Sequence, residues 1–245
     1  MGFGASKPAG QAQQPAQGQP GTHWDEDDED DADQPGDGIE HRRSKEGSIQ
    51  TDPVYCGAMA APGTRITAGT HRGRILKTRA GLETRPTTAL VREALFNIIG
   101  ASIEGATVLD LFSGGGTLGL EALSRGAARV TFVDRAQACA TIVAENLAAT
   151  GFAQRAEVHC ADALDWLKAH RSDLSAFNLI LLDPPYRSTA MAETLQRLDR
   201  LPLRPEALVV AEHHRLASIP ALERLQPLRQ HDYGSTRLSF FRYPG

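Results

Sequence analysis

Between residues 107 and 212 the chain repeats one hydrophobic pattern: a short apolar run, a turn, and a longer segment with apolar residues at helical spacing. The run at 178–183 is almost continuously apolar, which is typical of parallel strands covered by helices on both faces. Repeated strand–helix units predict an α/β fold with a doubly wound, mostly parallel sheet. We expect strands at 107–112, 129–134, 157–162, 179–183 and 207–212, and helices at 118–125, 136–150, 163–169 and 189–198.

The pattern changes on both sides of this region. After it, runs at 228–233 and 236–243 flank a turn at Gly234, which predicts an antiparallel C-terminal hairpin. Before it, residues 65–77 predict two short strands joined by a glycine-containing turn. An apolar stripe at helical spacing then predicts a helix that stops at Gly100. We therefore expect a small N-terminal β-hairpin and helix in front of the sheet.

The first 60 residues lack this patterning and differ in charge from the rest. They carry 12 of the 30 acidic and 4 of the 26 basic side chains, so they are strongly acidic, whereas the remaining 18 acidic and 22 basic residues make the rest mildly basic. Such a segment cannot bury enough apolar surface to offset its chain entropy. We expect a disordered acidic tail over 1–60, a basic hairpin and helix over 61–100, and the doubly wound domain over 101–245.

The cysteines and the hydropathy indicate what kind of protein this is and where it is located. Cys56, Cys139 and Cys160 are odd in number and have no CxxC spacing, which predicts neither a disulfide framework nor a metal site. No apolar run approaches the roughly 20 residues of a membrane span. We expect a cytoplasmic protein with no metal and no membrane partner.

The stretch from Val108 to Gly119 predicts a nucleotide-like ligand. An apolar strand stops at a run of glycines, and a helical pattern begins at once. Glycines let the backbone approach a ligand, and the free N–H groups of a helix start face the same place. Asp134 ends the next strand, 20 residues after Gly114, where a carboxylate can accept hydrogen bonds from a ribose diol. Both NAD and S-adenosylmethionine meet these demands.

Two further aspartates favour S-adenosylmethionine. Asp110 lies in the first strand just before the loop, where a carboxylate suits a cationic amino-acid group and repels the pyrophosphate of NAD. Asp162 ends the third strand, from which its side chain can reach an adenine amino group. For each residue the alternative is an ordinary capping or surface aspartate.

The four residues Asp183–Tyr186 follow the fourth strand and predict the chemistry. The exocyclic amine of a nucleobase is a poor nucleophile, and acceptors on both of its N–H bonds favour the pyramidal transition state. Asp183 and the carbonyl of Pro184 supply such acceptors, and Pro184 and Pro185 hold them still. Tyr186 offers a face on which a flipped base can stack. The alternative is a proline-stiffened strand end.

Basic residues gather in the N-terminal segment. Arg72, Arg74, Arg85 and Arg92 can each bind a phosphate bidentately. A solvated charged surface explains any single arginine equally well, but the group as a whole points to nucleic acid.

The chain resembles the RsmD family, bacterial methyltransferases that act on guanine N2 of small-subunit ribosomal RNA. The likeness covers residues 64–243 and excludes the acidic tail. The loop at 115–117 has the sequence Gly-Gly-Thr, where the family leads us to expect a loop of the Gly-Ser-Gly-Ala type. Its residues are still small. The matching segments are 65–69, 72–74, 85–97, 110–126, 183–186 and 233–239.

The resemblance implies a monomeric enzyme whose substrate is 16S rRNA in the 30S subunit or a late assembly intermediate. It implies a base pocket and catalytic residues at Asp183, Pro184, Pro185 and Tyr186. For S-adenosylmethionine it implies Asp110, Phe112, Ser113, Gly114, Gly116, Asp134, Arg135, Asp162 and Ala163. We expect the RNA to contact Arg65, Arg72, Arg74, Arg85, Thr87 and Arg92.

Other functions remain open from the residues alone. The same acceptor chemistry serves the methylation of adenine N6 in DNA or of a protein glutamine. An NAD-dependent oxidoreductase would share the glycine loop, but Asp110 disfavours it. A non-catalytic RNA-binding module would leave Asp183–Tyr186 without a purpose.

Overall fold

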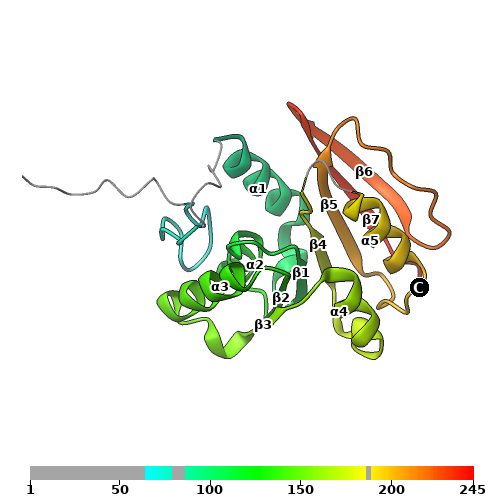
Figure 1. Ribbon diagram of the computed structural model, residues 1–245. Helices are drawn as coiled ribbons and strands as arrows, with labels where there is room; N and C mark the ends of the chain where they lie inside the picture. Colours follow the sequence, from blue (N-terminus) through cyan, green and yellow to red (C-terminus); the bar gives the residue numbers. More distant parts are fainter. Residues whose placement is uncertain (1–63, 79–85, 186–188) are drawn as a thin grey trace, which may run out of the picture. The chain divides into compact units, whose positions relative to one another are not determined.

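The computed structural model describes residues 64–78, 86–185 and 189–245. In this part of the chain seven strands form one sheet in the order β3-β2-β1-β4-β5-β7-β6 (Figure 1). The parallel strands are β1 (Thr107–Leu111), β2 (Arg129–Asp134), β3 (Ala156–Cys160), β4 (Leu179–Leu182) and β5 (Leu208–His214). The antiparallel hairpin consists of β6 (Gln226–Tyr233) and β7 (Thr236–Arg242).

Helices cover both faces of the sheet, as Figure 1 shows. One face packs against α1 (Pro86–Ile99), α2 (Thr117–Ser124) and α3 (Gln137–Thr150). The other packs against α4 (Ala163–Ala169) and α5 (Ala190–Asp199). Short 3-10 turns lie at Gly100–Ile103, Ala153–Arg155 and Arg171–Ala176. The doubly wound α/β prediction is therefore confirmed, with element boundaries within two residues of those expected.

The central strands of the sheet, β1 and β4, explain why the apolar core forms on both of its faces. All four residues of β4 are buried, and in β1 the side chain of Val108 joins one apolar cluster while Leu109 and Leu111 join the other. This alternation follows from the period of two in a strand. Gly119 lets α2 approach the sheet, because a Cβ there would lie 2.2 Å from Cε1 of Phe132. A larger residue would therefore push the glycine loop away from its place.

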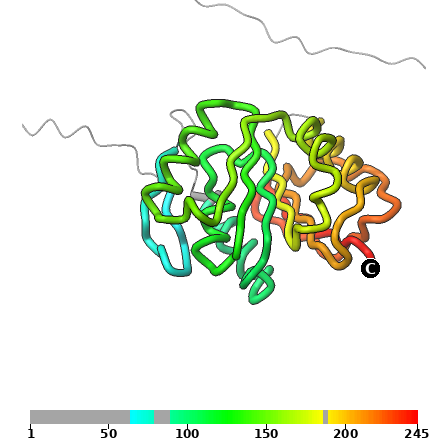
Figure 2. Tube along the Cα trace, turned by 90° about the horizontal axis from the view of Figure 1, so that it is seen from below, coloured from blue at the N-terminus to red at the C-terminus, as the bar shows by residue number. Residues whose placement is uncertain are grey.

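The N-terminal segment, residues 64–78, lies beside α2 and α3 (Figures 1 and 2). Its predicted hairpin is only partly formed, since a single antiparallel bridge joins Arg65 and Ile75. The turn between them bonds to α2 instead. Gly69 sits so close to Ser124 that an added Cβ would overlap its carbonyl, at 1.9 Å from the oxygen.

This segment and α1 share one core with the sheet. Ile66 and Leu76 of the segment and Leu95 and Phe96 of α1 belong to the same apolar cluster as Val108 of β1. Residues 64–78 and 86–100 thus have no separate core within the described part. The expected tail over 1–60 lies outside the described residues. No helix in the described ranges is long and apolar enough to cross a membrane.

Candidate active site

The largest concentration of predicted site residues lines a cavity of about 530 Å³ at the carboxyl ends of the parallel strands. The strand order reverses between β1 and β4, which is the place where open α/β sheets bind ligands. The volume suits a nucleotide-sized ligand. Its walls include Phe112, Ser113, Gly114, Asp134, Arg135, Asp162, Ala163, Asp183, Pro184 and Pro185.

The glycine loop joins β1 to α2 through several left-handed residues. Gly114 and Gly116 have φ of 52° and 78°, and Gly116 is the N-cap of α2. Phe112 also has a positive φ, 64°, which is strained for a residue with a side chain. The loop is pinned to β2, because the amide of Ser113 donates to the carbonyl of Val133 at 3.0 Å. The chain therefore turns sharply here and leaves the α2 N-terminus facing the cavity.

Asp134 holds the loop from the neighbouring strand. Its Oδ2 accepts the Gly114 N–H at 2.8 Å, and its Oδ1 accepts the Ala136 N–H at the same distance. Each carboxylate oxygen has a second lone pair, so these bonds leave capacity for a diol. Asp134 lines the cavity in which the sequence predicts a ribose contact, and its bonds to the loop add a structural role that the sequence did not indicate.

Asp162 caps α4 and also borders the cavity. Its Oδ1 accepts from the amides of Leu164 at 2.9 Å and Asp165 at 3.4 Å. The residue is exposed and lines the cavity beside Ala163. Capping and an adenine contact, which the sequence presented as alternatives, are compatible in this geometry.

Asp110 lies in β1 just before the glycine loop, as expected, but its side chain is buried. The side chain is only 1% exposed and lies beneath the glycine loop, outside the set of residues that line the cavity. Its Oδ2 accepts the Gly119 N–H at 2.9 Å, and Oδ1 has no hydrogen-bond partner among the described residues. Burial raises the pKa of Asp110 to about 7, which the bond from Gly119 partly opposes. Asp110 thus fastens α2 to β1 instead of forming a wall of the cavity.

Asp183 stands on the opposite side of the cavity from Asp134. It follows β4, is half-buried, and leads into Pro184, which is buried. Burial raises the pKa of Asp183 well above its usual range, and the carboxylates of Glu212 and Asp110 raise it further. A carboxyl group of raised pKa can take a proton near neutral pH. The predicted aromatic, Tyr186, lies outside the described residues.

Two charged residues of this cavity differ from what the sequence led us to expect. Glu212 of β5 is 8% exposed and was not predicted as a site residue. Arg92 of α1 was expected on an RNA-facing surface, but it is 5% exposed and lines the cavity. Its Nη2 donates to the carbonyl of Arg65 at 2.7 Å, and its Nε lies 3.6 Å from Oε2 of Glu121. Arg92 is therefore an interior residue, because the apolar stripe of α1 carries it into the core.

The remaining basic residues do lie at the surface of the N-terminal segment. Arg65, Arg72 and Arg74 are exposed. Arg74 is oriented by a bond from its Nη2 to the carbonyl of Ala149 at 2.8 Å. The side chains of Arg85 and Thr87 lie outside the described part of the chain.

Glu121 fixes this segment to α2 and was missed by the sequence analysis. It is completely buried, and its oxygens accept from the amide and hydroxyl of Thr67, at 2.8 and 2.6 Å, and from the amide of Ala68 at 3.0 Å. Arg125 pairs with it at 2.8 Å. A buried carboxylate with this many donors is well compensated. Thr67 and Ala68 lie more than 50 residues before Glu121, so spacing in the sequence gives no signal for these bonds.

Asn146 connects the segment to the glycine loop. Its amide nitrogen donates to the carbonyls of Lys77 at 3.0 Å and Gly115 at 3.1 Å, and its oxygen accepts the Lys77 N–H at 2.8 Å. Thr78, next along the chain, lines the cavity. The basic segment and the cavity are thus parts of one bonded structure.

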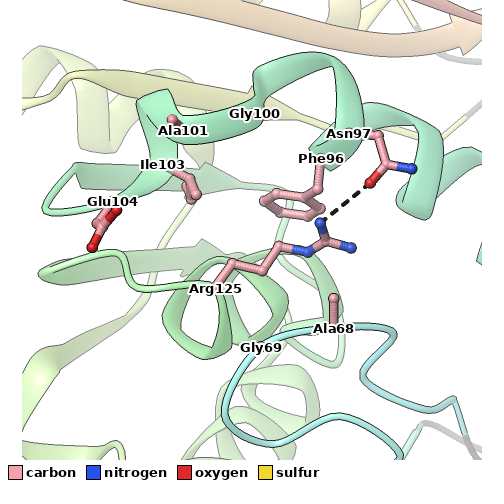
Figure 3. Close-up of a pocket in the computed structure, with 9 residues that line it drawn as sticks. All are labelled: Ala68, Gly69, Phe96, Asn97, Gly100, Ala101, Ile103, Glu104 and Arg125. Carbon is pink, nitrogen blue, oxygen red and sulfur yellow. Dashed lines mark hydrogen bonds between the residues drawn. The ribbon is translucent and has the colours of Figure 1, made fainter.

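A second hollow of about 550 Å³ lies between α1, the N-terminal segment and the C-terminal end of α2 (Figure 3). Its ionisable residues are Glu104 and Arg125, and Arg125 lies over the Phe96 ring, 5.2 Å from its centroid, and donates to Asn97 at 3.5 Å. None of the predicted catalytic or cofactor residues that the structure describes lines it. We therefore take the cavity at the strand ends as the candidate active site.

Comparison with known proteins agrees with this geometry. The family model described as Conserved hypothetical protein 95 matches residues 64–242. The Bacillus subtilis protein YlbH is 38% identical over 183 residues, 74% of this chain and all of that protein. The Escherichia coli ribosomal RNA small subunit methyltransferase D is 38% identical over 161 residues, 64% of this chain and 79% of that enzyme. The solved structure of Escherichia coli yhhF has a TM-score of 0.64 and 34% identity, and the match covers 74% of this chain and 98% of that one. The chain therefore belongs to the RsmD family.

Proposed function

We propose that this protein transfers a methyl group from S-adenosylmethionine to the exocyclic N2 amine of a guanine in 16S ribosomal RNA. The observation that carries the proposal is the position of Asp183 and Pro184, which open on the same cavity as the glycine loop and Asp134. One cavity thus combines a nucleoside site with acceptors for an amine. The name of the Escherichia coli relative supports a small-subunit RNA substrate.

The residues around the cavity fit the cofactor. Asp134 would accept from the ribose diol, and the second oxygen of Asp162 would accept from the adenine amine. Apolar contacts come from Val133, Ala161 and Cys139. When bound, S-adenosylmethionine supplies an electrophilic methyl group. Among the described residues, the cations that line the cavity are Arg92 of α1 and Arg135 after β2, which come from different parts of the fold and form no cluster for a pyrophosphate.

Asp183 and Pro184 prepare the amine for attack. The Asp183 carboxylate accepts one N–H bond and the Pro184 carbonyl accepts the other, which localises the nitrogen lone pair. Transfer of the methyl group would form the N–C bond and break the C–S bond of the cofactor, and the amine would then have one proton to lose. Asp183 is the group suited to take this proton, because burial raises its pKa well above its usual range.

The exposed arginines of the N-terminal segment give the enzyme its RNA surface. Arg65, Arg72 and Arg74 would contact phosphates of a structured RNA, as expected for a monomeric cytoplasmic enzyme acting on 30S particles. Glu121 and Asn146 hold this segment against α2 and the cavity. The residues that contact the RNA and the residues of the reactive site are thereby held in fixed positions relative to each other.

A transfer assay tests the proposal. The protein is incubated with labelled S-adenosylmethionine and 30S particles that lack the modification, with duplex DNA and a glutamine-bearing protein substrate in parallel. We expect label in 16S rRNA alone. Labelling of DNA or of the protein, with none in RNA, would contradict the proposal.

A further inference from the structure

Three charged side chains from three different elements open on the base side of the cavity: Asp183, Glu212 and Arg92. β4 and β5 are parallel neighbours, with Leu182 aligned to Ala211. Asp183 and Glu212 are the next residues of these two strands, so they lie side by side at the same sheet edge, with backbones about 4.8 Å apart. Arg92 reaches the same place from α1.

Two of these three side chains are largely removed from water although they line the cavity. Glu212 and Arg92 are 8% and 5% exposed. Burial lowers the pKa of Arg92, which Glu121 and Glu212 oppose. The oxygens of Glu121 are already engaged by Thr67 and Ala68, and the Arg92 Nε has no hydrogen-bond partner among the described residues. Glu212 attracts Arg92, so the two residues compensate part of each other's burial, and both line the cavity, where a polar ligand can meet them.

The chemistry of guanine matches this set of groups. Its Watson–Crick edge presents in a row the N2 amine, the N1–H donor and the O6 acceptor. Adenine and cytosine present an amine beside a ring nitrogen that accepts. A flipped base is read along this edge. An acceptor, a second acceptor and a cationic donor therefore select guanine among the bases that carry an exocyclic amine.

We propose that Glu212 and Arg92 are the specificity-determining residues of the base pocket, Glu212 accepting from guanine N1–H and Arg92 donating to O6. The inference rests on the proposed function, since it takes the amine beside Asp183 to be guanine N2. A base that lacks the N1–H places its own ring acceptor against the Glu212 carboxylate. The site then carries a buried acceptor without a donor, which is strongly disfavoured.

The experiment uses 30S particles reconstituted with 16S rRNA that carries either guanine or 2-aminopurine at the mapped target. 2-Aminopurine keeps the amine but lacks both N1–H and O6. We expect wild-type kcat/KM to favour guanine by at least about 100-fold. Equal transfer to both bases would overturn the inference, whatever the variants do.

The variant Glu212→Gln assigns the effect to this residue. Its amide can donate to the ring nitrogen of 2-aminopurine, so we expect the preference for guanine to fall by at least about tenfold. Glu157→Gln, at an exposed position on β3, is the matched control and should keep the wild-type ratio. Cofactor binding by calorimetry and the unfolding midpoint verify that both variants fold.

The outcomes distinguish a failure of the proposed function from a failure of the inference about Glu212 and Arg92. If wild type transfers no methyl group to guanine N2, the proposed function fails. If it does so and Glu212→Gln lowers transfer to both bases equally, only the inference fails.

Discussion

The two sides of the cavity use their carboxylates differently. On the side of β2 and β3, Asp134 and Asp162 each accept two backbone N–H bonds, which fix the glycine loop and the start of α4. On the side of β4 and β5, Asp183 and Glu212 lie close together, and each raises the cost of charge on the other. The first arrangement suits the holding of a neutral diol and amine. The second suits a step in which an amine loses a proton.

The largest effect should come from removing the acceptor on the reactive side. We expect Asp183→Ala to lower kcat by at least about 1000-fold, because one acceptor of the amine is lost, while the affinity for the cofactor stays within about twofold. Single-turnover methyl transfer and calorimetry measure the two quantities. If the variant lost cofactor binding, Asp183 would belong to the cofactor side of the cavity, and its assignment to the reactive side would be wrong.

Asp110 lies between the two sides, and its titration predicts a pH-dependent stability. Its folded-state pKa of about 7 exceeds the ordinary value of 3.8, so between these values the folded protein holds more protons than the unfolded chain. The contribution of Asp110 to the free energy of unfolding therefore falls as pH rises from about 4 to about 7, by on the order of 4 kcal/mol. Asp110→Asn should lack this fall. Urea unfolding at pH 5 and pH 8 measures the part of this fall above pH 5, about 3 kcal/mol.

The same variant connects Asp110 to the chemistry. Removing this charge removes one cause of the raised pKa of Asp183, so the pH profile of kcat/KM should move to lower pH. If the free energies of unfolding of wild type and Asp110→Asn differed by the same amount at pH 5 and pH 8, Asp110 would not be a buried carboxyl of raised pKa.

A smaller effect is expected on the cofactor side. Asp134→Ala removes the ribose acceptor and two bonds that hold the loop. We expect cofactor affinity to fall by roughly 10- to 100-fold, with kcat at saturating cofactor less affected. Asp165→Ala, at an exposed site in the first turn of α4, is the control. A large loss of kcat with unchanged affinity would reverse the assignment of the two sides.

The comparison of the two sides also shows which parts of the fold and of the site can be predicted from the sequence. The strands, the glycine loop, Asp134, Asp162 and Asp183 were predicted because each is set by local spacing: a strand end, then a carboxylate. Glu212 lies inside β5, two residues before the strand ends at His214, so this rule does not identify it. The interior position of Arg92 and the bonds of Glu121 to Thr67 depend on which helix face meets a distant segment. Local patterns do not contain that information.

The measurement that tests the central claim most directly is mass spectrometry of the nucleosides of 16S rRNA after incubation of unmodified 30S particles with enzyme and S-adenosylmethionine. The account predicts one new nucleoside, N2-methylguanosine, in the wild-type reaction and none with Asp183→Ala. A methyl group on any other base or atom, or an equal yield from Asp183→Ala, would contradict it.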